Sequence, residues 1–150
     1  MATSCLSPKH TEVQHYDLGL RDTASELNWR VSSISYSGYR SQKLLTREGQ
    51  ALQEEHSLRW KEDPDELLKN FWQSNYNVAA DALDLKVTVL RFEFHESKAQ
   101  AVVLLTWGKD KKTQRILAEA ALSGATVEAK VSAMSKAVDL LTTKISKAVQ

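Results

Sequence analysis

The chain has 150 residues and a mass of 16.9 kDa, a length typical of one domain that folds without disulfides or metals. Twenty basic residues balance nineteen acidic ones, and this near-neutral charge argues against a general nucleic-acid binder and against a polybasic membrane-surface patch. The single cysteine excludes an internal disulfide, and the four scattered histidines offer no helical pair for a metal ion. No apolar run approaches the ~20 residues of a membrane-spanning helix.

The first sixty residues are predicted to contain four strands. Residues 13–18 and 27–36 show apolar and polar side chains in alternation, which is the strand period. The polar stretches 43–48 and 53–60 are expected to be short strands at sheet edges, where charges discourage unwanted pairing.

A helix is predicted from Asp63 to about Ala80. Asp63 suits the N-cap, and Pro64 has no N–H group to leave unsatisfied in the first turn. The apolar side chains that follow at helical spacing are Leu67, Leu68, Phe71, Trp72 and Val78 or Ala79.

Residues 85–123 predict a three-stranded meander with turns at 96–98 and 108–111. The alternation shifts by one residue after Val89, which is the pattern that a β-bulge produces. Residues 101–107 are apolar on both faces almost to their end, and this pattern predicts a central strand that is covered on both sides.

The clearest predicted element is a long C-terminal helix over 126–150. Its apolar stripe comprises Val127, Val131, Met134, Val138, Leu141, Ile145 and Ala148, with polar residues such as Thr142 and Ser146 opposite. We expect the stripe to pack on a sheet; a coiled-coil seam is less favoured because its flanks lack paired opposite charges. Two helices and about seven strands predict an α/β fold, a three-layer α/β/α sandwich with a mixed β-sheet and a helix on each face.

Motifs for catalysis are missing from the sequence. There is no phosphate-binding glycine loop, nucleophile elbow, HExxH or CxxC, so we expect no enzymatic activity, no catalytic residue, no cofactor and no metal. Trp29, Trp72 and Trp107 are expected in the core. Trp60 ends a polar strand just before the helix cap, and it either fixes the helix start to the sheet or belongs to a partner surface.

Cys5 has two readings. Residues 1–10 are small and polar and are expected to form a flexible tether before a single α/β domain at 11–150. Within this tether Cys5 is either a free thiol or a lipid attachment site. Small residues precede it, but no complete signal peptide is present. Either the protein is cytosolic, or the sequence begins after a signal peptide that has been removed.

Several short motifs occur in an order that resembles a known family. They are Tyr16-Asp17-Leu18-Gly19, Leu44-Leu45-Thr46-Arg47, Leu58-Arg59-Trp60 before Asp63-Pro64, Val89-Leu90-Arg91-Phe92-Glu93, Leu104-Leu105-Thr106-Trp107 and Ala133-Met134-Ser135-Lys136-Ala137. In this order the chain resembles the ABC-type transport auxiliary lipoproteins, the Pqi-type lipoproteins of Gram-negative bacteria. The resemblance runs from Cys5 to Gln150. It departs from the family at 27–39, which is Ser-rich where a more apolar segment is expected.

The resemblance implies a non-enzymatic lipoprotein at the periplasmic face of the outer membrane, anchored through acylated Cys5. It implies a sandwich similar to the amino-terminal domain of TolB, and partnership with ABC or MCE-type envelope proteins that move lipids between membranes. The alternatives are a soluble lipid- or small-ligand-binding module, marked by a cavity between the long helix and the sheet, and a cytosolic interaction domain.

Four residues are candidates for partner binding: Tyr36, Tyr39, Arg59 and Trp60. Their polarity or aromatic character is not explained by folding, and aromatics beside arginine are typical interface anchors. An edge strand that ends in Arg59-Trp60 would also offer main-chain pairing, so we expect that the chain can self-associate into a dimer or ring. No nucleic acid is expected among the partners.

Overall fold

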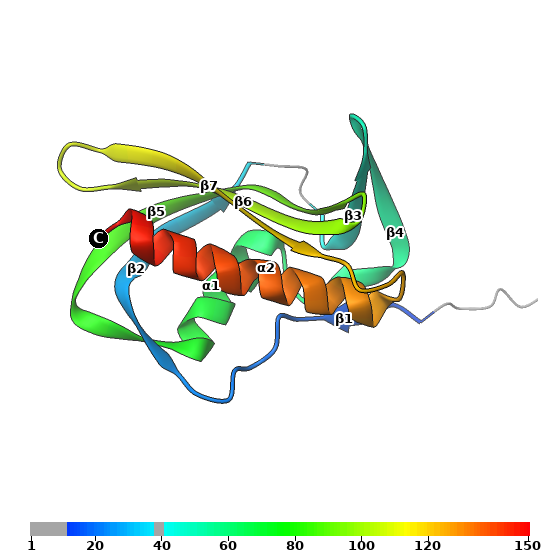
Figure 1. The fold of residues 1–150 in the computed structure, drawn as a ribbon, viewed down its shortest axis with the longest axis horizontal. Coiled ribbons are helices and arrows are strands. Elements are labelled where there is room, and N and C mark those ends of the chain that lie inside the picture. Colours follow the sequence, from blue (N-terminus) through cyan, green and yellow to red (C-terminus); the bar gives the residue numbers. More distant parts are fainter. Residues whose placement is uncertain (1–11, 38–40) are drawn as a thin grey trace, which may run out of the picture.

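The computed structural model describes residues 12–37 and 41–150, with the elements in the order shown in Figure 1. They are β1 (Gln14–Tyr16), β2 (Ser25–Tyr36), β3 (Lys43–Glu48), β4 (Ala51–Trp60), α1 (Pro64–Asn75), β5 (Tyr76–His95), β6 (Lys98–Trp107), β7 (Lys112–Ala121) and α2 (Val127–Ala148).

The seven strands form one mixed sheet in the order β1-β4-β3-β5-β6-β7, and β2 pairs with β5 outside this path. The long strand β5 organises the sheet. It runs antiparallel to β6 on one side and parallel to β2 and then β3 on the other. The predicted meander of β5, β6 and β7 is confirmed, and the register shift between Val89 and Arg91 is the predicted bulge.

The C-terminal helix α2 packs along the sheet as predicted. Thr126 caps it, because its side chain accepts a hydrogen bond from the Ala129 N–H at 3.2 Å. The stripe residues Met134, Val138, Leu141 and Ile145 are fully buried, mainly against β6 and β7. The apolar stripe is therefore core, and a coiled-coil seam on this face is excluded. Among the described residues no helix is long and apolar enough to cross a membrane.

The first helix is shorter than predicted, because α1 ends at Asn75 and not near Ala80. The Asn75 side chain donates to the Phe71 carbonyl at 2.8 Å and accepts from the Arg21 N–H at 2.6 Å, which ties the helix end to the chain before β2. From Tyr76 onward the backbone pairs with β2, so Val78 belongs to a strand. Asp63 occupies the N-cap position, but its side chain makes no capping hydrogen bond, which corrects the predicted role.

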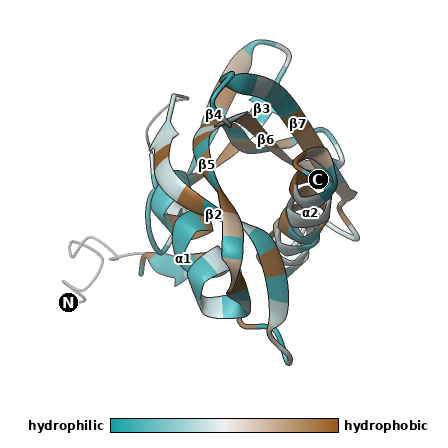
Figure 2. Cartoon of the chain, turned by 90° about the vertical axis from the view of Figure 1, so that its left-hand side faces the viewer, coloured by the Kyte–Doolittle hydropathy of each residue, from teal (hydrophilic) through white to brown (hydrophobic). Residues whose placement is uncertain are grey.

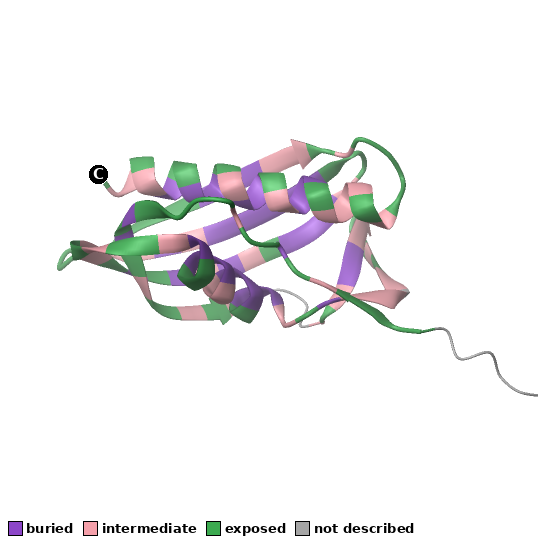
Figure 3. Ribbon diagram, turned by 90° about the horizontal axis from the view of Figure 1, so that it is seen from below, coloured by how far each residue is buried: buried purple, intermediate pink, exposed green. Residues whose placement is uncertain are grey.

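Trp29 of β2 shows that both helices lie on the same face of the sheet. Its ring meets Trp72 of α1 edge-to-face, with centroids 5.0 Å apart, and its Nε1 donates to Ser146 Oγ of α2 at 2.9 Å. Figures 2 and 3 show the sheet curving around one side of this helix pair. The α/β class, mixed sheet and long C-terminal helix are confirmed, whereas the placement of one helix on each face is corrected.

The burial of β6 on both faces explains that error. Gln100 and Val102 point away from the helices and are only 6% and 5% exposed. Gln100 donates to Glu119 of β7 at 3.3 Å and pairs in register with Glu93 of β5. Long side chains of the neighbouring strands thus shield the outer face of β6. A strand apolar on both faces does not require a helix on each.

The predicted sheet edges are also corrected. β3 lies inside the sheet between β4 and β5, and β1 pairs with β4 along Leu58–Trp60. Most of the described side chains of β3 and β4 are half-buried or buried, so their polar sequences do not mark edge positions. Among the described strands, β2 has a neighbour on one side only, as do β1 and β7 at the two ends of the strand order.

Candidate functional site

The structure rejects Trp60 as a partner-binding residue. Its side chain is 1% exposed, meets Phe92 edge-to-face at 5.1 Å between centroids, and stacks on Phe94 at 6.4 Å. The main-chain N–H of Trp60 donates a hydrogen bond to the Gln42 carbonyl at 2.6 Å. Trp60 therefore anchors the end of β4 in the core just before α1, which confirms the structural alternative.

Of the other predicted site residues, the two that the structure describes, Tyr36 and Arg59, lie on different strands. Cys5 and Tyr39 lie outside the described residues. Tyr36 is half-buried at the end of β2 and packs against the core, while Arg59 is half-buried on β4. These two strands do not pair with each other. Arg59 Nε is buried and has no hydrogen-bond partner. This part of the side chain is therefore not accessible to a partner protein.

The open edge of β2 is the feature best suited to hold a partner. Ser33–Tyr36 pairs in regular register with Lys86–Val89 on β5, and Ser37 N–H donates to the Val89 carbonyl at 3.0 Å. Because main-chain groups alternate in direction along a strand, those of Ile34 face away from β5. No described strand pairs with Ile34 on this side. This part of β2 forms an edge that can accept another strand.

The earlier half of β2 is less suited to strand addition. Register shifts between Leu27 and Trp29, and between Val31 and Ser33, interrupt its ladder with β5. The exposed pair Arg30–Asp84, 2.7 Å apart, lies between them. Bulges and charges of this kind discourage pairing at an edge. Ser33 and Ser35 are exposed and small, so among the described residues of β2 the regular part of the edge is Ser33–Ser35.

A small pocket lies between β2 and α1. Its volume is about 190 Å³, with Leu27, Trp29 and Trp72 among its apolar lining and Lys69 and Gln73 contributed by α1. Pockets that enclose whole small-molecule ligands usually measure ~300–1,000 Å³. This one suits a single inserted apolar side chain better than a lipid tail.

The outer face of the sheet carries a buried ion pair. The Arg47 guanidinium of β3 pairs with Glu93 of β5, whose side chain is 4% exposed, and this hydrogen bond raises the pKa of Arg47. Gln100 lies beside Glu93, and its Oε1 is buried without a partner. In the described part of the chain, no group of three or more metal-ligating side chains is suitably placed for a metal ion. The Arg47–Glu93 pair fixes β3 to β5.

Sequence reasoning missed the β2 edge. Alternation in 27–36 identified a strand, but alternation does not show how many neighbours a strand has. A usable signal was present in the small polar residues Ser32, Ser33, Ser35 and Ser37, because small side chains leave the main chain accessible.

Comparison with known proteins supports the fold. No family model and no curated protein matches the chain. An uncharacterized protein of known structure matches with a TM-score of 0.70 and 13% identity over 93% of this chain and 100% of its own. Protein XCC0632 from Xanthomonas campestris, described as DUF330, matches with a TM-score of 0.62 and 19% identity over 88% of this chain and 92% of its own. Such low identities establish a shared fold and no more.

Proposed function

We propose that this protein is a non-enzymatic accessory lipoprotein of an ABC- or MCE-type intermembrane lipid transport system. Acylated Cys5 would anchor it at the periplasmic face of the outer membrane, and the folded domain would bind a protein partner. The observation that carries the binding role is the edge of β2 at Ser33–Ser35, which no other described strand covers. The main chain of this edge can supply hydrogen bonds to an extended segment, and the pocket along the earlier half of β2, at Leu27–Val31, can take one apolar side chain of the same segment.

The family resemblance supports this proposal through the core. Trp60 and Phe92, from two of the resembling motifs, pack together, and Ala133, Met134 and Ala137 from a third motif are 0–2% exposed. These residues bear on the fold that the domain adopts. The identity of a partner must be encoded on the surface, where the chain departs from the family in its Ser-rich second strand.

The alternative of a soluble lipid-binding module is less favoured. It calls for a cavity between the long helix and the sheet, but Met134, Val138 and Leu141 are fully buried there against the strands. A cytosolic interaction domain would use the same β2 edge and differs only in the fate of Cys5.

The experiment uses the precursor with a C-terminal tag, expressed in its native host and purified from membranes. Mass spectrometry should find a diacylglyceryl group on Cys5. Cys5→Ser should abolish this modification and release the protein from membranes washed with high salt, whereas Ser7→Ala should keep both the modification and the salt-resistant membrane association. Ser35→Lys should keep the anchor and the thermal stability but lose the co-purifying transport protein, because a charge on the edge blocks strand addition. Ser123→Lys, at an exposed position outside β2, is the matched control.

The outcomes separate the parts of the proposal. An unmodified Cys5 in a soluble protein would favour the cytosolic interaction domain. Equal loss of the partner in the Ser35→Lys and Ser123→Lys variants would remove the β2 edge as the binding surface.

A further inference from the structure

The nearly neutral chain has a strongly uneven charge distribution. Six exposed basic residues gather at the tip of the β6–β7 hairpin, residues 108–115, and on the last two turns of α2, where the one acidic residue is Asp110. They are Lys109, Lys111, Lys112, Arg115, Lys144 and Lys147, which we call the basic hairpin surface. None of the six forms an ion pair with another described residue, so their charge is not neutralised locally.

Two parts of the fold bring these residues together. A tight turn at the hairpin tip, closed by the Lys111 N–H on the Gly108 carbonyl at 3.2 Å, holds three lysines within four positions. Beside it, Arg115, Lys144 and Lys147 line one surface depression of about 400 Å³, and Lys144 Nζ donates to the Leu117 carbonyl at 2.7 Å. The geometry thus presents cations from a strand pair and from a helix on one side of the molecule.

The composition of this surface favours phosphate headgroups over a protein. Five of its six cations are lysines, which are depleted at protein–protein interfaces, where arginine and aromatic residues are enriched. Lysine is a flexible point charge that suits a mobile anionic layer. Trp107, at the start of the turn, packs partly against the core and is not an open stacking platform for a nucleic-acid base.

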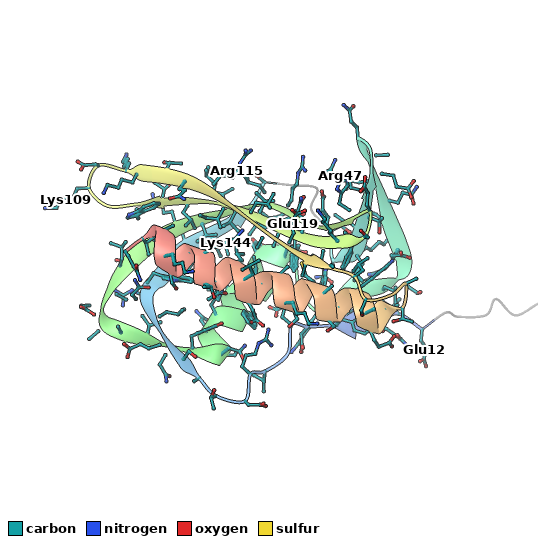
Figure 4. The ribbon with its side chains drawn as sticks, in the orientation of Figure 1. Glu12, Arg47, Lys109, Arg115, Glu119 and Lys144 are labelled. Atoms are coloured by element: carbon teal, nitrogen blue, oxygen red, sulfur yellow. The ribbon has the colours of Figure 1, made fainter. Side chains whose placement is uncertain are left out.

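We propose that the basic hairpin surface docks on the headgroups of an anionic phospholipid bilayer, independently of any acyl chain. Figure 4 shows Lys109 at the end of the molecule opposite Glu12, the first described residue. The intervening helix α2 has 22 residues and a length of ~33 Å. The surface therefore provides a second membrane contact that is distant from the point where the N-terminal segment enters the fold.

The test uses the 150-residue chain without an acyl group, in flotation with vesicles of phosphatidylglycerol and phosphatidylethanolamine or of phosphatidylcholine alone. A lysine near an anionic surface contributes about fivefold to binding, so K109Q/K111Q/K112Q should weaken binding to the anionic vesicles ~100-fold. The control K61Q/K98Q/K136Q removes three exposed lysines elsewhere and should leave most of the binding intact. Circular dichroism verifies that both variants are folded.

Binding should fall steeply as salt rises, because the contact is electrostatic. Equal affinity for the two kinds of vesicle, or equal weakening by the two triple variants, would overturn the proposal. So would binding to a polyglutamate peptide without binding to anionic vesicles, which would make the surface a site for acidic proteins. None of these outcomes bears on acylation of Cys5, so this inference and the proposed function can fail separately.

Discussion

Two buried tryptophans depend on hydroxyl groups that look like surface residues in the sequence. Trp72 Nε1 donates to Thr142 Oγ1 at 2.9 Å, and Trp29 Nε1 donates to Ser146 Oγ at the same distance, one turn further along α2. A buried indole N–H needs an acceptor, and these hydroxyls supply it. Thr142 is 3% exposed, so its assignment to the solvent side of the helix was wrong. Beside its apolar stripe, α2 thus carries two hydroxyl groups, on Thr142 and Ser146, that accept hydrogen bonds from tryptophans of α1 and β2.

Replacing Thr142 by valine tests this role, because valine keeps the shape and removes the acceptor. The Trp72 N–H would be left buried without a partner, so the free energy of unfolding in urea should fall by about 1–3 kcal/mol. Thr142→Ser retains the hydroxyl and should be the more stable of the two variants. A valine variant as stable as the wild type would show that the hydrogen bond contributes nothing.

At the scale of elements, α2 offers an internal comparison between adjacent leucines. Leu141 is fully buried, whereas Leu140 is 41% exposed. Leu141→Ala should therefore lower the free energy of unfolding by about 2–5 kcal/mol, since it removes core contacts and leaves a cavity. Leu140→Ala should change it by less than ~0.5 kcal/mol, as expected for a surface position. Similar losses in the two variants would mean that the apolar stripe is not the face that packs on the sheet.

Local patterns predicted the elements better than their arrangement. Helical spacing identified α2, and alternation identified the meander and its bulge, because these signals lie within a few residues. The end of α1 was missed because Tyr76–Val78 is drawn into β5 by parallel pairing with β2, a partner some 50 residues earlier in the chain. The secondary-structure propensities of neighbouring residues cannot predict pairing with a strand so distant in the sequence. The open edge of β2 and the burial of Trp60 depend on the same long-range order, so the candidate site was predicted less well than the fold.

At the scale of the whole molecule, one core joins all the layers. Trp29 contacts both helices from β2, Trp60 fixes β4 to β5, and the buried residues of both helices and the sheet form one continuous cluster. Arg21 adds a polar link, because its guanidinium contacts Asp139 of α2 at 2.8 Å and lies 4.8 Å from the centre of the Phe71 ring on α1. Neither helix has a core of its own.

The shared core predicts a single cooperative unfolding transition, which is also what a single domain over 11–150 requires. Far-UV circular dichroism reports mainly on the helices and the sheet, whereas tryptophan fluorescence reports on residues in β2, β4, α1 and β6. The urea midpoints from the two methods should coincide, because a two-state domain loses all its structure together. Leu141→Ala should move both midpoints by the same amount, although the tryptophans lie on other elements. A fluorescence change that precedes the loss of helical signal would show that part of the sheet unfolds independently of α2.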